Sequence, residues 1–245
     1  MKDSLAADMA NADGVAMSIV NGYLPEVYAL NHNYGTFEVE KGARINTSYT
    51  LYDRQTVERL IRDDPKLIPH PKLDKNKDIR WNKSRFNSGI TQGILQGESL
   101  DKIAKRVALG VSTSDYKAAL RNARTATTGA ENAGRLDSYE RADKMGIKVK
   151  KVWMATLDNH TRDSHALLDG EKVDYDEPFS NGLMYPGDTD TDDPSEVWNC
   201  RCTMIADVDG SVDLSNMDRR NDRLGDMSYD EWKKAHERKH KNRRK

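Results

Sequence analysis

Two short segments contain the residue types that metal sites and active sites use. One reads HTRDSH, and the other reads NCRC and holds both cysteines of the chain. A tetrahedral zinc site needs four ligands, and the candidates here are His165, Cys200 and Cys202, with Asp158 or His160 as the fourth. The spacing is C-x-C rather than the C-x2–4-C usual in structural zinc sites. The alternative is therefore a pair of buried cysteines that act as small hydrophobic residues.

An arginine, a histidine and an aspartate stand at helical spacing around the first segment. Arg162, His165 and Asp169 are at i, i+3 and i+7, so a helix would place them on one face. Beside a cysteine, such a face could activate a nucleophile. We favour a hydrogen-bonded network that fixes a loop-rich module, because the sequence has no glycine-rich phosphate loop and no G-x-S-x-G motif. This predicts a chain that is not an enzyme and has no cofactor, with zinc as the open alternative.

A helical N-terminal two-thirds is expected to precede and position these segments. The clearest helix runs over 114–145, where alanines three or four apart form a small-residue stripe. Gly146 fits the left-handed position that ends it. A shorter helix is expected from Ser99, which can cap it, to Gly110, which can end it. Residues 34–51 alternate and are rich in β-branched and aromatic side chains, which predicts a hairpin or an extended arm. Another short helix is expected at 53–62.

A small module of mixed structure is predicted after the long helix. Its strand-like segments are 148–156, 171–179 and 198–208. Ser228 and Glu231 form a capping box that predicts a C-terminal helix. The fold class is therefore α+β, with a mostly helical N-terminal two-thirds, a small C-terminal α+β module and a basic helical tail. The predicted segments are 1–75 for a helical or extended arm, 76–146 for a helical region, 147–210 for the module and 211–245 for the tail.

Charge is distributed in blocks along a chain whose net charge is only −1. Residues 59–151 contain 21 Lys and Arg against 11 Asp and Glu, whereas residues 158–196 contain 2 against 12. Residues 232–245 contain 8 Lys and Arg and one glutamate, and such a basic end can bind DNA phosphates without reading sequence. The candidate DNA-binding residues are Lys233, Lys234, Arg238, Lys239, Lys241, Arg243, Arg244 and Lys245.

The distribution of apolar residues indicates where the protein is located. No apolar run approaches the about 18 residues that a membrane-spanning helix needs, and the N-terminal residues lack the apolar core of a signal peptide. These features predict a soluble protein made in a cytoplasm, with no membrane partner. Because 36% of the residues are hydrophobic and 32% are charged, extended or partner-dependent parts are expected.

Four motifs in a fixed order resemble the phage Mu F-like minor head proteins, also called head morphogenesis proteins, of tailed bacteriophages. The motifs are ARTATTGAENAG at 123–134, KVWMATLDNHTRDSHALLDGE at 151–171, PFSNGLMYPGD at 178–188 and EVWNCRCT at 196–203. The resemblance extends over residues 80–235. Many members have Arg-Thr-Glu where this chain has Arg124, Thr125 and Ala126.

The resemblance implies a low-copy virion protein of the inner capsid or portal region, assembled in the host bacterial cytoplasm. Its implied partners are the portal protein, the major capsid protein or both, and double-stranded DNA. In this interpretation Trp153 anchors the module core, Asp158 pairs with Arg162, and His165 meets the NCRC segment. The implied structural signature is Arg124, Trp153, Asp158, Arg162, His165, Asp169, Gly170, Asn199, Cys200, Arg201 and Cys202.

An enzyme or toxin-linked module is the alternative, because Mu F-like modules are also fused to toxin domains. In that case His165, Cys200 and Cys202 would carry the chemistry, with or without zinc.

Overall fold

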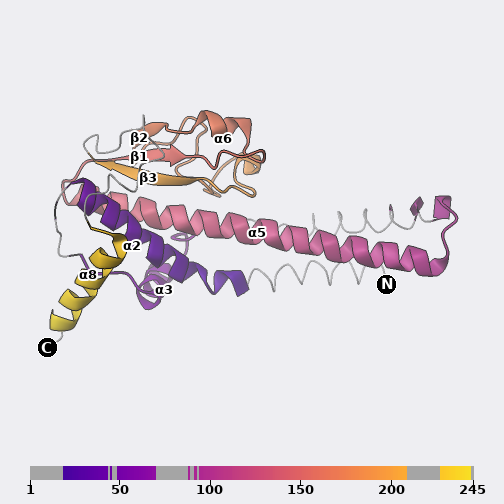
Figure 1. Ribbon diagram of the computed structural model, residues 1–245, viewed down its shortest axis with the longest axis horizontal. Helices are drawn as coiled ribbons and strands as arrows, with labels where there is room; N and C mark the ends of the chain where they lie inside the picture. The colour runs from indigo at the N-terminus through magenta and orange to yellow at the C-terminus, as the bar shows by residue number, and fades with distance from the viewer. Residues whose placement is uncertain are drawn as a thin grey trace. The chain divides into compact units, whose positions relative to one another are not determined.

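The computed structural model in Figure 1 describes residues 19–43, 45, 49–69, 88, 91–92, 94–208 and 227–243. The chain divides into two compact units, and the second, residues 23–70 with 125–245, contains both candidate segments. The described residues are mostly helical, with one small antiparallel sheet. The predicted α+β class is confirmed. The predicted division into four segments stays a prediction.

The long helix α5, Leu100–Lys144, is continuous over 45 residues. This corrects the expectation that one helix ends at Gly110 and another begins near 114. A single glycine costs a helix only about 1 kcal/mol relative to alanine, and no proline interrupts this stretch, so the backbone continues. The helix ends where expected, at Gly146, whose φ of 85° is the left-handed conformation of a C-terminal cap.

Residues 34–42 are helical rather than part of a hairpin, because they belong to α2, Leu24–Gly42. One face of α2 packs closely on α5. At Gly134 of α5 an added Cβ would lie 2.5 Å from the carbonyl oxygen of Tyr28, so only glycine permits this approach. Burial against α5 therefore overrides the local β-propensity. The short helix expected next is confirmed as α3, Arg54–Asp63.

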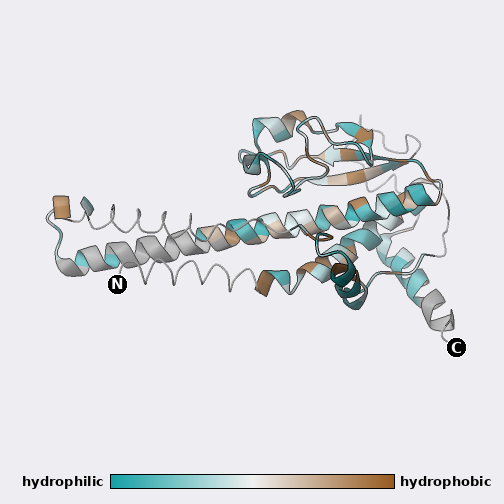
Figure 2. Ribbon diagram, turned by 180° about the vertical axis from the view of Figure 1, so that it is seen from behind, coloured by the Kyte–Doolittle hydropathy of each residue, from teal (hydrophilic) through white to brown (hydrophobic). Residues whose placement is uncertain are grey.

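A three-stranded antiparallel sheet follows α5, with the order β2-β1-β3. The central strand is β1, Val149–Met154, and its neighbours are β2, Lys172–Asp174, and β3, Thr203–Val208. Trp153 lies opposite Met204 in this register. All three lie within the predicted strand-like segments, and Figure 2 shows hydrophobic stretches within the sheet.

Two of the hydrophobic cores among the described residues of the second unit include residues of the sheet. The first joins α2 and the C-terminal part of α5 to the sheet, and its buried members are Val39, Tyr139, Ala142, Val149, Met204, Ala206 and Val208. The second lies in the loop-rich part of the module, and its buried members are Trp153, Leu168, Phe179, Leu183, Val197, Cys200 and Cys202. The candidate cysteines are therefore core residues as well as potential ligands.

The C-terminal helix α8, Tyr229–Arg243, docks on α2 through buried aromatic side chains. The Trp232 indole donates a hydrogen bond to Glu40 Oε2 at 2.6 Å. The expected capping box is present, since the Ser228 amide donates to Glu231 Oε2 at 2.8 Å and the Glu231 amide donates back to Ser228 Oγ at 3.3 Å. Among the described residues, no helix is long and apolar enough to cross a membrane.

The predicted DNA-binding residues lie on α8 or beyond its end. Lys233 is half-buried and Lys234 is exposed. The remaining six lie outside the described residues, either by side chain or entirely: Arg238, Lys239, Lys241, Arg243, Arg244 and Lys245.

Candidate functional site

Polar side chains on one face of α5 bind the backbone of the NCRC segment. Thr125 Oγ1 accepts a hydrogen bond from the Asn199 amide at 3.1 Å, and Thr128 Oγ1 donates to the Cys200 carbonyl at 2.8 Å. Asn199 has a φ of 57°, a left-handed conformation that asparagine adopts more readily than most residues. The backbone of this turn is thereby fixed against the helix.

Asn132, one turn beyond Thr128 on the same face, satisfies several buried backbone groups at once. Its Nδ2 donates to the carbonyl oxygens of Pro186 at 3.0 Å and Cys202 at 3.3 Å. Its Oδ1 accepts from the Met204 amide at 3.1 Å. The side chain is fully buried, and it joins the acidic loop, the NCRC segment and β3 to α5.

The contacts of these three side chains are not evident from the alanine stripe that predicts the helix. The signal in the sequence is the placement of Thr125, Thr128 and Asn132 at i, i+3 and i+7 among small residues. A buried polar side chain needs a hydrogen-bond partner, so a polar line within a small-residue stripe predicts a polar neighbour. In this fold the neighbour is a backbone segment.

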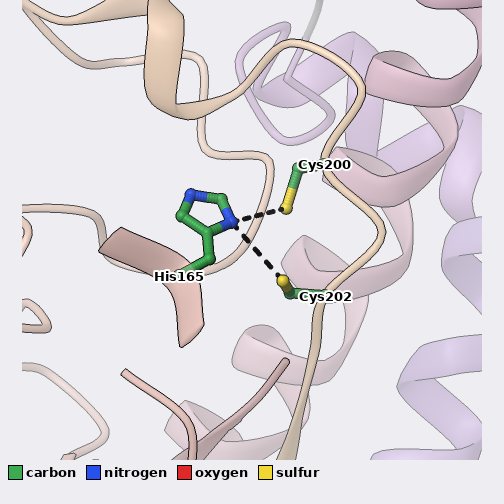
Figure 3. A group of neighbouring side chains, drawn as sticks. All are labelled: His165, Cys200 and Cys202. Atoms are coloured by element: carbon green, nitrogen blue, oxygen red, sulfur yellow. Dashed lines mark hydrogen bonds between the residues drawn. The ribbon is translucent and has the colours of Figure 1, made fainter. Parts of the chain in front are cut away.

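The side chains of Cys200 and Cys202 lie against the imidazole of His165, as Figure 3 shows. His165 Nδ1 is 3.7 Å from Cys200 Sγ and 3.4 Å from Cys202 Sγ. All three residues are buried, and both cysteines are free thiols. His165 comes from the short helix α6, Asp163–Leu167, so residues far apart in sequence form one compact group of nitrogen and sulfur atoms.

A carboxylate occupies the other side of the imidazole. His165 Nε2 is 3.1 Å from Oε2 of Glu196, which ends the short helix η1, Pro194–Glu196. The Ser164 hydroxyl donates to Glu196 Oε1 at 3.1 Å, and Asn181 Nδ2 lies 3.4 Å from Oε2. The ring therefore has its Nε2 beside this carboxylate and its Nδ1 facing the two sulfurs.

Glu196 is the residue that sequence reasoning missed. The expected face combined His165 with Asp169, but Asp169 Oδ1 instead accepts from the Ala155 amide at 2.9 Å. Helix α6 is too short to carry the i+7 position, so Asp169 falls beyond its end. The only sequence signal for Glu196 is its place in EVWNCRC, four residues before the first cysteine.

The two thiols differ in their protonation. The hydrogen bond between them and burial raise the pKa of Cys200, whereas the hydrogen bond from Cys200, with that to His165, lowers the pKa of Cys202. The pair therefore favours a thiolate at Cys202. A thiolate is the form of cysteine that acts as a nucleophile or a metal ligand.

Of the remaining signature residues, Trp153 and Gly170 lie close to this group. Trp153 is fully buried, and its ring centroid is 5.2 Å from that of His165. Gly170 has a φ of 83°, and its amide donates to the Trp153 carbonyl at 2.9 Å. Arg124 is exposed on α5.

Asp158 pairs with Arg201, not with Arg162 as expected. Arg201 Nη2 is 2.7 Å from Asp158 Oδ1, and this hydrogen bond lowers the pKa of the Asp158 carboxyl group. Arg162 instead donates to the Trp198 carbonyl. The spacing of four residues suited a helix, but residues 158–161 form a turn before α6 begins.

Comparison with known proteins identifies the family. Residues 84–205 match the family model described as Phage Mu protein F like protein. The chain belongs to this family. The matched segment contains every hydrogen bond described above between α5 and the NCRC segment, as well as the His165 group. The predicted family is thus confirmed.

Three relatives are similar to this chain over most of its length. The chain is 34% identical over 221 residues to the NAD(+)–arginine ADP-ribosyltransferase EFV of Enterococcus faecalis, covering 85% of this chain and 45% of that protein. It is 27% identical over 247 residues to Minor head protein GP7 of Bacillus phage SPP1, covering 96% and 76%. It is 26% identical over 201 residues to an uncharacterized protein of Haemophilus influenzae, covering 81% and 41%. The chain thus spans less than half of two of these relatives. No solved structure matches it.

The prediction that the chain is not an enzyme is contradicted by the first of these relatives. A protein named as an ADP-ribosyltransferase is 34% identical to this chain over a stretch that covers 85% of this chain. The prediction relied on the absence of phosphate-loop and nucleophile-elbow motifs. Such motifs mark only some catalytic architectures, so their absence does not exclude others.

Substituting Asn132 by alanine is expected to destabilise the module. The change leaves the Met204 amide and two carbonyl groups without their buried partner, which predicts a loss of about 2–4 kcal/mol in the free energy of unfolding. Urea denaturation followed by circular dichroism measures it. The matched control is Asn31→Ala, because among the described residues the Asn31 side chain bonds only to the Val27 carbonyl of its own helix, and a change below about 0.5 kcal/mol is expected. Equal losses in both variants would contradict the role assigned to Asn132.

Proposed function

We propose that this chain is a minor head protein of a tailed bacteriophage and acts in head morphogenesis. The observation that carries the proposal is the family match over residues 84–205. It is supported by similarity to a phage minor head protein across 76% of that protein's length. The proposed location is the virion, with assembly in the bacterial cytoplasm.

The proposed partner is the portal protein or the major capsid protein, contacted through the loop-rich side of the module. Leu157 and Leu167 support this surface, because their side chains are 65% and 87% exposed. Covering a leucine side chain contributes about 1.5–3 kcal/mol to association. Both leucines lie in or beside the acidic block 158–196, which can add charge complementarity to a basic partner surface.

Incorporation into heads tests this proposal. We expect the chain, co-expressed with the portal and major capsid proteins of the same phage, to sediment with procapsids at low copy. Replacing Leu157 and Leu167 by aspartate should reduce incorporation about tenfold or more, as loss of at least one apolar contact predicts. The matched control is Leu30→Asp on α2, where the leucine is 50% exposed. Absence of the folded wild-type chain from procapsids and from purified portal would contradict the proposed function.

The basic tail supports a second contact, with packaged double-stranded DNA. Residues 238–245 contain six Lys and Arg, and they lie beyond the buried anchors Trp232 and His236 of α8. Removal of 238–245 therefore tests DNA binding without removing either anchor.

Binding to duplex DNA is expected to depend steeply on salt. If about six phosphates are neutralised, affinity should fall by about three decades between 50 and 200 mM salt. The variant ending at Glu237 should bind weakly and lose most of this slope, as measured by fluorescence anisotropy. A triple variant of the exposed residues Lys66, Lys144 and Lys148 to glutamine serves as the control. Unchanged binding after the truncation would exclude the tail as the DNA site.

Arginine ADP-ribosyl transfer is the second candidate function. It is favoured by the similarity between a protein of that name and this chain, over a stretch that covers 85% of this chain. A chain that carries the activity should form ADP-ribosyl-arginine from NAD(+) and free arginine, detected by mass spectrometry, with heat-denatured protein as the control. No product from the folded chain removes this candidate and leaves the head morphogenesis proposal intact.

A further inference from the structure

We infer that His165, Cys200 and Cys202 bind one zinc ion in a three-ligand site with an open fourth position. His165 lies on α6, and the two cysteines lie just before β3. The ion would therefore join α6 to this segment at the second hydrophobic core. This inference does not depend on the proposed role in head assembly.

The geometry of the three donor atoms fits a tetrahedral ion. With Zn–S near 2.3 Å and Zn–N near 2.0–2.1 Å, tetrahedral angles place a sulfur and a nitrogen ligand about 3.5–3.6 Å apart. The two distances from His165 Nδ1 to the sulfurs are 3.4 and 3.7 Å. All three atoms lie within 4.8 Å of one another, so little movement is needed to place them around one ion. Two thiolates and an imidazole are a donor set that zinc prefers.

The orientation of the imidazole also fits a ligand. Metal-binding histidines usually donate their second N–H to a carboxylate, which fixes the tautomer and increases the basicity of the ligating nitrogen. Glu196 Oε2 lies 3.1 Å from His165 Nε2, on the side away from the sulfurs. Ser164 and Asn181 hold this carboxylate in place. Glu196 is therefore a positioning residue, and Nδ1 is the atom that would bind the ion.

The cysteines are held in place by bonds that do not involve their side chains. Thr128 binds the Cys200 carbonyl, and Asn132 binds the Cys202 carbonyl. Fixing these carbonyls against α5 therefore holds both cysteines beside His165. The site is preformed, and a preformed site loses little conformational entropy when the ion binds.

A water molecule or a small external ligand would occupy the fourth coordination position of the zinc ion. Among the described residues, no other histidine, cysteine or carboxylate joins the group. His160 is exposed, and the Asp158 carboxylate is bound by Arg201. Neither supplies the fourth ligand that their sequence positions suggested. Three protein ligands with an open position are typical of zinc ions that exchange ligands or take part in catalysis.

Metal analysis of the full-length protein tests the inference. The chain is purified under reducing conditions, supplied with zinc and dialysed, and zinc is then measured by inductively coupled plasma mass spectrometry. We expect one zinc per chain in the wild type, and less than a tenth of that in Cys200→Ser and in Cys202→Ser. His160→Ala is the matched control and should retain full occupancy. Glu196→Gln should retain the site with zinc affinity reduced about 10–100-fold, as expected for a carboxylate that orients a histidine ligand.

Two measurements on the wild-type chain keep the test independent of whether the serine variants fold. Blocking the thiols with a mercurial reagent should release one zinc per chain, followed with a chelating dye. Cobalt substituted for zinc should give the absorption of a tetrahedral thiolate complex. A folded, reduced wild-type chain without zinc, or zinc retained after both thiols are blocked, would overturn the inference, and so would a Cys200–Cys202 disulfide in the reduced preparation.

Discussion

The hydrogen bonds between one face of α5 and the NCRC backbone are the interactions on which the module depends. Thr125, Thr128 and Asn132 bind the turn that leads into β3, so they fix where the last strand begins and which way its cysteines point. Without them, buried amide and carbonyl groups would lack partners, at a cost of about 1–3 kcal/mol each. The loop-rich core around Trp153 has little regular structure of its own and relies on this attachment.

A second polar connection joins α2 to the same assembly. Arg135 Nη1 lies 3.0 Å from Glu38 Oε2 and 3.2 Å from the Met204 carbonyl, so a single guanidinium group links α2, α5 and β3. Burial raises the pKa of Glu38, although Arg135 opposes that shift. A buried ion pair is weak evidence for net stability. Its clearer effect is specificity, because only one register of the two helices brings these groups together.

The His165 group lies within the segment that matches the family model. The match bears on the role of the chain in head assembly, whereas the His165 group bears on metal binding. The match covers a segment shared with a phage minor head protein and with a protein named as an ADP-ribosyltransferase. Neither the family match nor the names of these relatives refer to a metal at the thiol–imidazole group of this chain. Its metal content is therefore best measured on this chain itself, separately from head assembly and from transfer of ADP-ribose.

Local sequence determined several features of this protein. The small-residue stripe predicted the part of α5 after residue 114, and local composition predicted the segments that contain the three strands. The Ser228–Glu231 pair predicted the start of α8, and Gly146 predicted the end of α5. These predictions are correct because each feature depends on residues within a few positions of one another. The types of residue in HTRDSH and NCRC likewise indicated a thiol–imidazole group.

Tertiary structure decided the rest. Residues 34–42 are helical because α2 packs on α5 at Gly134, whatever their local preference. His165 takes Glu196, not Asp169, as its carboxylate partner, because α6 is too short and η1, at the end of the acidic block, lies beside it. Contacts between residues distant in sequence depend on how loops close, and spacing along the chain does not encode that closure.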